Sequence, residues 1–249
     1  MAERIILEEK ANKTIYREGN LIIKEHVPSH PKENVFNEAY IHACIEACGL
    51  PIPKIISVTP SNGGGALTME YVEGKTLEQL LREDPSRAEE YLGKLVDIQL
   101  EIGSHRVTRL RNTRYKMEEV IKKLTDIDAS TRYELLQRLH GMANHTKLCH
   151  GDLVPSNIII REDGSYCVLD WAHATSGNAG AEAAITYMRF SLEHPEYADM
   201  YLHIFCEKAD MAIQYVQKWM PIVAAAQLAK HKESEKDLLM KWISVAEYQ

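Results

Sequence analysis

The spacing of apolar residues changes near Thr76, and this change constrains the fold more than any other feature of the sequence. Before Thr76, short β-branched or apolar runs alternate with turn signals, which is typical of hairpins in a sheet. After it, apolar residues recur every three or four positions, which is the spacing of one helical face. We therefore expect a strand-rich part followed by a mostly helical part. The clearest helical set is Tyr91, Leu95, Ile98 and Ile102.

The strand-rich part is predicted to form a five-stranded sheet with one helix. Glu-Gly-Asn at residues 18–20 and Ser-Asn-Gly-Gly-Gly at 61–65 are hairpin turn signals. Asn34 is the predicted N-cap of a helix that runs to about Ala47, with Gly49 as its stop. Its apolar positions are Phe36, Ile41, Ala43 and Ile45. The predicted strands are Ile5–Glu8, Thr14–Arg17, Leu21–His26, Ile55–Thr59 and Ala66–Tyr71.

The remainder is predicted to be helical except for three short strands between Lys147 and Trp171. From Ala181 onward the chain is expected to be helical, with Pro195 and Pro221 as punctuation. Two charged amphipathic helices are expected near Tyr115–Leu124 and Thr131–Asn144, and the strand runs are 148–149, 158–160 and 167–169.

Length and composition indicate an ordinary globular protein. The 249 residues suffice for one large domain or two packed lobes, and 45% of them are hydrophobic. The formal charge, 29 basic minus 36 acidic residues or −7, is spread along the chain, which argues against nucleic acid as a partner. No apolar stretch approaches the length of a membrane span, so no membrane partner is expected. Five cysteines without a C-x-x-C pair favour a reduced, cytoplasmic protein, and the sequence leaves the oligomeric state open.

One motif carries chemistry. Residues 150–157 read His-Gly-Asp-Leu-Val-Pro-Ser-Asn, and residues 169–171 read Leu-Asp-Trp. Four fixed residue types at these spacings arise by chance with odds on the order of one in two thousand. A phosphoryl group in transfer spreads negative charge, so the protein needs metal ions at fixed places and one group that orients the attacking hydroxyl. Asp152 suits the second task, and Asn157 and Asp170 offer the hard oxygen ligands that Mg²⁺ prefers.

The motif resembles that of the protein-kinase-like superfamily, and more closely its aminoglycoside phosphotransferase and choline kinase branch. Protein kinases carry H-R-D-L-x-x-x-N and D-F-G, whereas His-Gly-Asp-Leu and Asp-Trp are similar to the small-molecule branch. The resemblance implies an α+β, bilobal protein-kinase-like fold. Residues 1–69 would form a nucleotide-binding lobe, 70–74 a hinge, and 75–249 a larger, mostly helical lobe for catalysis and acceptor binding.

The resemblance also implies roles for single residues. Asp152 would be the catalytic base, and Asn157 and Asp170 would hold Mg²⁺. Lys24, in Leu-Ile-Ile-Lys at residues 21–24, would bind the α- and β-phosphates, and Glu38 on the next helix would hold Lys24 extended.

The rest of the predicted nucleotide site follows the same resemblance. In the hinge, Thr-Met-Glu-Tyr-Val-Glu-Gly at residues 68–74, the Glu70 carbonyl and the Val72 amide would bind adenine. Met69 and Ile159 would complete that part of the site, and either Asn12 or the Thr14 hydroxyl would stand in for a missing phosphate-binding glycine.

Two segments depart from the family pattern. Residues 8–14 read Glu-Glu-Lys-Ala-Asn-Lys-Thr, without the glycines that normally let backbone amides approach the phosphates. After Trp171, a Gly-Asp-Pro-type segment is replaced by Gly-Asn-Ala-Gly at residues 177–180.

The implied function is that of a small-molecule kinase, with ATP or GTP as donor, Mg²⁺ as cofactor, and as acceptor a small hydroxyl compound such as an aminoglycoside, sugar or amino alcohol. The alternative is a catalytically silent nucleotide-binding or regulatory relative. Acidic residues after Ala181 weakly favour a cationic acceptor, and aromatic residues there would stack on a sugar or cage an amine, or simply form core. The acidic residues are Glu182, Glu193, Glu196, Asp199 and Asp210. The aromatic residues are Tyr187, Phe190, Tyr197, Tyr201, Phe205, Tyr215 and Trp219.

Overall fold

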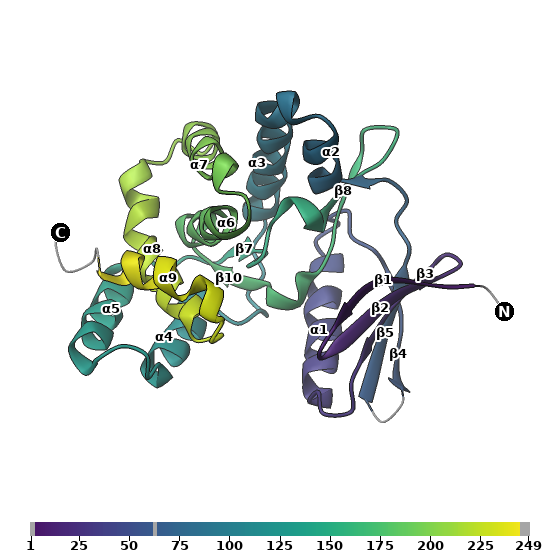
Figure 1. The fold of residues 1–249 in the computed structure, drawn as a ribbon, viewed down its shortest axis with the longest axis horizontal. Coiled ribbons are helices and arrows are strands. Elements are labelled where there is room, and N and C mark those ends of the chain that lie inside the picture. Colours follow the sequence, from purple (N-terminus) through teal and green to yellow (C-terminus); the bar gives the residue numbers. More distant parts are fainter. Residues whose placement is uncertain (1–2, 62–63, 245–249) are drawn as a thin grey trace. The chain divides into compact units, whose positions relative to one another are not determined.

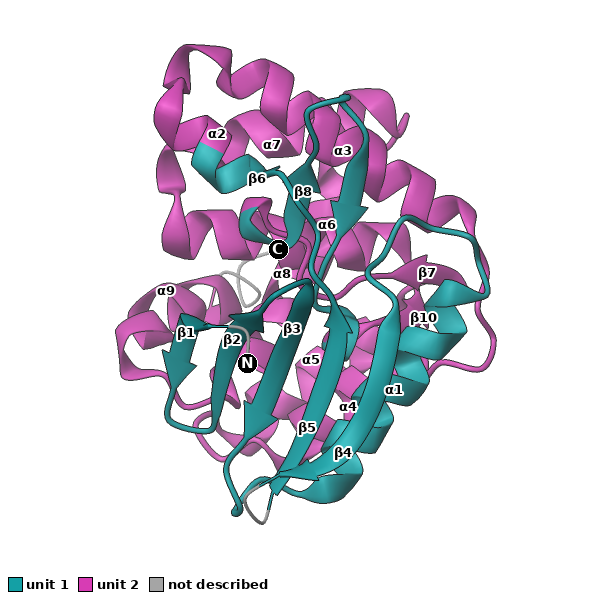
Figure 2. Ribbon diagram, turned by 90° about the vertical axis from the view of Figure 1, so that its right-hand side faces the viewer, with its two compact units in different colours: residues 1–79, 156–172 teal, residues 80–155, 173–249 magenta. Residues whose placement is uncertain are grey.

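The computed structural model describes residues 3–61 and 64–244. The chain divides into two compact units, coloured separately in Figure 2. Unit 1 comprises residues 1–79 and 156–172, and unit 2 comprises residues 80–155 and 173–249. Residues 156–172, which include Asn157 and Asp170, therefore belong to the same compact unit as the N-terminal strands. The predicted division into a nucleotide-binding lobe, a hinge at residues 70–74 and a catalytic lobe stays a prediction.

Unit 1 is built on the predicted five-stranded sheet (Figure 1). Every strand pairs antiparallel with its neighbours, in the order β1-β2-β3-β5-β4. Each predicted strand overlaps an observed one, while residues 62 and 63 of the second predicted turn lie outside the described residues. The strands are β1 (Arg4–Lys10), β2 (Lys13–Glu18), β3 (Leu21–His26), β4 (Ile55–Ser61) and β5 (Gly64–Glu70).

The single helix of the sheet, α1 (Lys32–Glu46), packs against β4 and β5. Its predicted start at Asn34 is wrong, because Pro31 precedes the first turn and the Asn34 amide donates to the Pro31 carbonyl at 3.0 Å. The assignment of Phe36 and Ala43 to the apolar face is also wrong, since Phe36 is 63% exposed and Ala43 is exposed. The predicted Ile41 and Ile45 are buried, and the other buried residues of the helix are Val35, His42 and Cys44.

A second small sheet in unit 1 lies beside the motif residues Asn157 and Asp170. The strands β6 (Lys75–Thr76), β8 (Ile158–Ile160) and β9 (Tyr166–Val168) pair antiparallel in the order β6-β8-β9. Gly74, which precedes β6, has φ of 141°, and a Cβ there would lie 2.4 Å from the Ile160 carbonyl oxygen. Only glycine therefore lets this chain segment approach β8 so closely.

Unit 2 is mostly helical, with a two-stranded sheet of β7 (Lys147–Cys149) and β10 (Thr175–Gly177). Pro195 opens α7, as predicted, but Pro221 lies inside α8, so its predicted role as a break is wrong. Pro221 is buried, and burial of the α8 face offsets the lost hydrogen bond. The helices are α3 (Ala88–Ser104), α4 (Thr113–Lys123), α5 (Ala129–Gly141), α6 (Ala179–Glu193), α7 (Pro195–Lys208), α8 (Ile213–Leu228) and α9 (Glu233–Ser244), and α2 (Leu77–Glu83) spans the boundary between the units.

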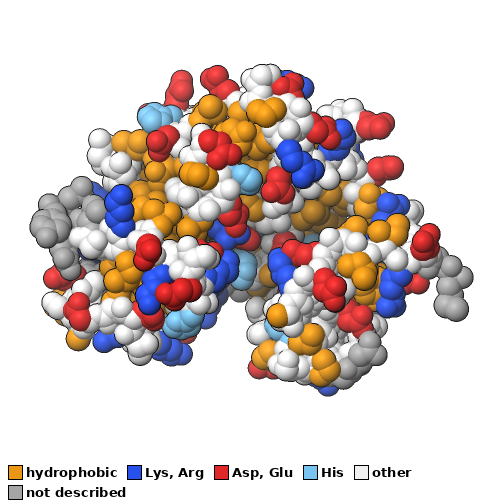
Figure 3. Space-filling view, viewed as in Figure 1, with side chains coloured by type: hydrophobic (Ala, Val, Ile, Leu, Met, Phe, Trp, Pro, Cys, Tyr) orange, Lys and Arg blue, Asp and Glu red, His pale blue; other side chains and the backbone are white. Residues whose placement is uncertain are grey.

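Four of the seven aromatic residues named above after Ala181 belong to the core of unit 2. Phe190, Tyr201, Phe205 and Trp219 are at most 2% exposed, so these four are core. On the face drawn in Figure 3, acidic and basic side chains are interspersed. Within the described ranges, no helix is both long and apolar enough to cross a bilayer.

Candidate active site

A buried lysine in unit 1 joins two carboxylates from distant parts of the sequence. Lys24 on β3 is 5% exposed, and its Nζ lies 2.6 Å from Glu38 Oε1 on α1 and 3.0 Å from Asp170 Oδ1. Burial alone would lower the pKa of Lys24, but Asp170 and Glu38 raise it above its ordinary value. The ammonium group thus keeps its charge, and the structure brings together three of the predicted site residues.

The position of Asp170 depends on the β8–β9 hairpin. The Leu169 amide donates to the Asn157 carbonyl at 2.8 Å, so the chain segments that carry the two predicted metal ligands lie side by side. Asp170 itself has φ of 52°, a left-handed conformation that Asp tolerates better than most residues. Its side chain is 34% exposed and therefore accessible to a ligand.

These two residues fit a magnesium ion that arrives with a nucleotide. One carboxylate and one amide oxygen, with phosphates and water in the other positions, are a usual ligand set for Mg²⁺. Consistent with so few protein ligands, the described residues contain no cluster of three or more His, Cys, Asp or Glu that could hold a metal.

Lys13 was not predicted, and the structure places it beside Asp170. Its Nζ lies 3.9 Å from Asp170 Oδ2. In the β2–β3 register, Ile15 is opposite Lys24, and side chains alternate between sheet faces. Lys13 therefore shares the face of Lys24, whereas the predicted Thr14 lies on the other face. Alternation along Lys13-Thr14-Ile15 is the signal that could have identified Lys13.

His26 lies opposite Lys13 in the same register and stacks on His30. Desolvation, together with the charges of His30, Lys24 and Lys13, lowers the pKa of His26 to about 4. His26 is thus neutral near pH 7, and the positive charge of this group resides on the two lysines.

The predicted adenine-binding residues form an apolar cluster in unit 1. Val72 and Ile159, each 9% exposed, pack with Cys167, and Leu169 packs against them. Met69 lies in β5 opposite Ile22 of β3.

Glu70, the other predicted hinge residue, is the last residue of β5 and is hydrogen-bonded to Lys54, which precedes β4. The Glu70 amide donates to the Lys54 carbonyl at 3.0 Å, and the Glu70 carboxylate accepts from the Lys54 amide at 3.2 Å.

The loop that carries the predicted base Asp152 belongs to unit 2. His150 is fully buried, and its Nδ1 accepts a hydrogen bond from the Asp152 amide at 3.3 Å. The Glu182 carboxylate on α6 accepts hydrogen bonds from the amides of His150 and Gly151 at 2.9 and 3.0 Å. Gly151 has φ of 80°, and a Cβ there would lie 2.5 Å from the His173 carbonyl oxygen. The loop is therefore held in place through its backbone amides.

Glu182 cannot serve a cationic acceptor as expected. Burial raises its pKa to about 7, although the amides of Gly151 and His150 lower it. Its carboxyl group is engaged with the loop backbone and is 4% exposed.

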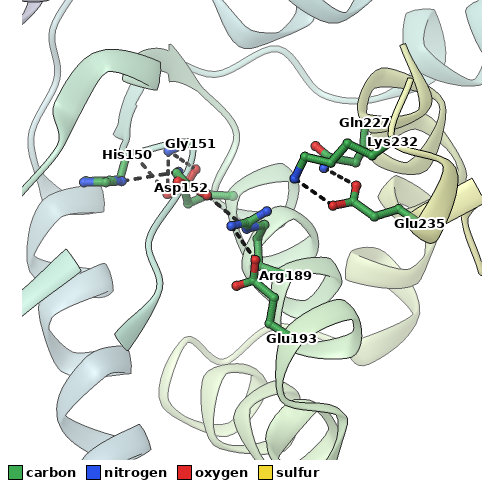
Figure 4. Close-up of polar contacts among 9 residues, drawn as sticks. His150, Gly151, Asp152, Arg189, Glu193, Gln227, Lys232 and Glu235 are labelled. Atoms are coloured by element: carbon green, nitrogen blue, oxygen red, sulfur yellow. Dashed lines mark hydrogen bonds and ion pairs between the residues drawn. The ribbon is translucent and has the colours of Figure 1, made fainter. Parts of the chain in front are cut away.

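Arg189 is the functional candidate that the sequence did not reveal. Its Nε lies 3.1 Å from Asp152 Oδ1, and its Nη2 lies 2.7 Å from Glu193 Oε1 (Figure 4). The Arg189 side chain is 16% exposed, so this ion pair is less screened than one on the surface. Arg189 follows Asp152 by 37 positions, and no local pattern links the two.

Asn178 explains the departure at residues 177–180. Its side chain accepts the Gly180 amide at 2.8 Å and so caps α6, the helix that carries Glu182 and Arg189. This segment has a structural role in unit 2.

Comparisons place the chain among phosphotransferases. It matches the phosphotransferase enzyme family over residues 4–213, while no curated protein matches it. A thermostable mutant of aminoglycoside phosphotransferase APH(4)-Ia, in a ternary complex with ADP and hygromycin B, is 12% identical, covers 98% of this chain and 92% of its own, and has a TM-score of 0.75. The structure of aminoglycoside-3'-phosphotransferase of type VIII is 15% identical, with 90% and 93% covered and a TM-score of 0.67. The streptomycin–ATP–APH(2")-IIa ternary complex is 15% identical, with 99% and 91% covered and a TM-score of 0.64. The predicted α+β, protein-kinase-like fold is confirmed.

Proposed function

Since the chain belongs to the phosphotransferase enzyme family and is a small-molecule phosphotransferase that acts on an alcohol group, we propose that it transfers the γ-phosphoryl group of ATP, or of GTP, to a hydroxyl of a small acceptor with Asp152 as the base. The observation that carries this proposal is the grouping of Lys24, Glu38 and Asp170, because the Lys24–Asp170 ion pair joins residues 146 positions apart. A catalytically silent relative would not need a buried lysine between two carboxylates, because such an arrangement is costly to bury.

Lys24 binds the α- and β-phosphates in this proposal. Glu38 acts as a positioning residue, since its 2.6 Å contact fixes the Lys24 ammonium group. Lys13 contributes a second positive charge on the same sheet face and takes the place of the missing glycine amides. Val72 and Ile159 offer an apolar surface to the base, and the Glu70 carbonyl and Val72 amide give it hydrogen bonds.

Asn157 and Asp170 would hold Mg²⁺. The ion supplies charge neutralisation of the phosphate oxygens when it is bound. Asp170 also contacts Lys24, so the same carboxylate would position both the Lys24 ammonium group and Mg²⁺ for the phosphates.

Asp152 receives the proton of the acceptor hydroxyl. In the reaction, the hydroxyl oxygen forms a bond to the γ-phosphorus, the bond from that phosphorus to the β–γ bridging oxygen breaks, and the nucleoside diphosphate leaves with the electron pair. Arg189 contacts the Asp152 carboxylate and acts as a positioning residue that restricts its rotation.

A small acceptor agrees with the short connection after Trp171. Only residues 172–178 separate Trp171 from α6, whereas protein kinases use a long activation segment that ends in A-P-E to position peptides. We expect phosphorylation of small hydroxyl compounds and none of protein substrates.

The test is Asp152→Asn, which keeps the shape of the side chain and removes the base. Turnover of an accepted substrate, followed by ³¹P NMR, should fall by roughly 10²-fold or more, while nucleotide affinity should hardly change. The control is Asp163→Asn, which alters an exposed aspartate in the β8–β9 turn. If the wild type binds nucleotide, phosphorylates nothing in a broad screen and behaves like Asp152→Asn, the silent alternative is correct and the proposal fails.

A further inference from the structure

Unit 2 contains a cavity that the proposed chemistry does not use. Its volume is about 270 Å³, it is open to solvent on one side, and it is lined by residues of α4, α6, α8 and the β10 region. Drug-sized ligands usually occupy roughly 300–1,000 Å³, so the cavity suits a smaller molecule.

The cavity wall combines an apolar surface with two cations. Most of the wall is aliphatic or methionine side chain, which suits a carbon skeleton rather than a fully hydrated ion. Lys116 of α4 and Lys230, just after α8, also line it, and the lining residues include no Asp or Glu. The apolar lining residues include Met117, Val120, Ile185, Met188, Val223 and Ala226.

The two lysines are close enough for the charge of Lys230 to act on Lys116. Desolvation lowers the pKa of Lys116, and the charge of Lys230 is the next cause. Desolvation also lowers the pKa of Lys230. Among the described residues, neither ammonium group lies within 4 Å of a carboxylate, and Lys116 Nζ instead donates to the His173 carbonyl at 3.3 Å.

The carboxylates whose charges act on these two lysines are engaged with other groups. Glu182 accepts the amides of the motif loop. Asp152 pairs with Arg189. Glu235 pairs with Lys232 at 2.8 Å and accepts from the Gln227 side chain at 2.6 Å (Figure 4). Lys116 is half-buried and Lys230 is exposed, so both ammonium groups can reach an anion, and a charge-assisted hydrogen bond to each would favour its binding.

The cavity also adjoins the loop of the proposed base. Gly151, which precedes Asp152, is one of its lining residues. The charge of Asp152 acts on Lys230, since it raises the Lys230 pKa against the effect of desolvation. A molecule anchored at the lysines would thus lie next to the loop that carries Asp152.

We propose that this cavity binds the acceptor, and that the acceptor is a small alcohol bearing an anionic group, a carboxylate or a phosphate, on an apolar or sugar-like body. The anion contacts Lys116 and Lys230, and the body packs on the methionine and aliphatic wall. This inference rests on the proposed function and specifies its acceptor. Polycationic acceptors are disfavoured because Lys116, Lys230 and Arg189 all carry positive charge.

The experiment measures binding by calorimetry to the full chain without nucleotide, using two series matched except for charge. The first series is 4-(hydroxymethyl)benzoate, 1,4-benzenedimethanol and 4-(hydroxymethyl)benzylamine. The second is glucuronate, glucose and glucosamine, and glucose 6-phosphate separates phosphate from carboxylate. The anionic member of at least one series should bind about tenfold or more tighter than its neutral and cationic analogues.

Variants tie that preference to the two lysines. Lys116→Met and Lys230→Met should each weaken anion binding about fivefold or more and leave neutral analogues unchanged, and Lys230→Arg should restore most of the affinity. Lys218→Met, at an exposed position of α8, is the matched control and should change nothing.

Three results would overturn the inference: the amine or the neutral alcohol binds as tightly as the anion, the double lysine variant keeps the preference, or no anion binds at about 10 mM. Because nucleotide is absent, failure of the proposed function is distinguishable. An anion that binds through the lysines but is not phosphorylated contradicts the proposed function and leaves the cavity assignment standing.

Discussion

Lys24 and Glu38 should act as one unit in nucleotide binding. Lys24→Met removes a charged hydrogen-bond donor, so ATP affinity measured by calorimetry should fall about tenfold or more. Glu38→Gln should cause a smaller loss, because it loosens the Lys24 ammonium without removing it. In the Lys24→Met background, Glu38→Gln should have almost no further effect on affinity. Lys54→Met, at an exposed lysine of unit 1, is the control. Fully additive losses would show that Glu38 does not act through Lys24.

Lys13 and Thr14 provide a matched pair of neighbours on opposite sheet faces. Because only Lys13 shares the face of Lys24, Lys13→Met should weaken ATP binding about fivefold or more, and Thr14→Val should leave it nearly unchanged. Binding of AMP, which lacks the β- and γ-phosphates, should respond little to either variant. A larger effect of Thr14→Val than of Lys13→Met would restore the role first assigned to the Thr14 hydroxyl.

Because of the short turn between β1 and β2, nucleotide binding should depend on Mg²⁺ and on the charge of Lys24 rather than on backbone amides. The predicted loop over residues 8–14 is mostly strand, and only Ala11 and Asn12 connect β1 to β2. Two residues without glycine cannot wrap phosphates as a glycine-rich loop does. Removal of Mg²⁺ by chelation should therefore lower ATP affinity about tenfold or more, and Lys24→Met should lower it further. Tight ATP binding that survives both changes would contradict this account of the turn.

The strands were predictable because alternation and turn residues are local signals, whereas α1 was less so. Its apolar and polar residues are spread around the helix, and the choice of buried face depends on how α1 packs against β4 and β5. Phe36 is exposed for that reason, although it is the largest apolar side chain in the helix. The helix start at Lys32 was missed because Pro31 presets the first turn without a side-chain cap.

In the candidate site, too, residues in a local sequence pattern were predictable and residues placed by packing were not. Asp152, Asn157 and Asp170 were predictable because one short motif fixes their order, and Lys24 was predictable because its strand precedes the helix with Glu38. Arg189, Lys116 and Lys230 were not, since their positions depend on the packing of α4, α6 and α8. The residues to which we assign acceptor binding and the positioning of Asp152 are thus the ones that sequence reasoning did not identify.

The buried Glu182 should make the stability of the protein depend on pH. Its pKa is raised from 4.5 to about 7 in the folded chain, so between these values the folded state binds more protons than the unfolded state. The free energy of unfolding should therefore fall as pH rises from about 5 to about 8, by up to ~3 kcal/mol from this group. Glu182→Gln keeps an oxygen that can accept the amides of His150 and Gly151, and it should flatten the decrease in melting temperature over this range. Glu207→Gln, at an exposed glutamate of α7, should leave the decrease unchanged. If Glu182→Gln keeps the full decrease while remaining folded at pH 5, another group causes it and Glu182 is ionised in the native state without cost.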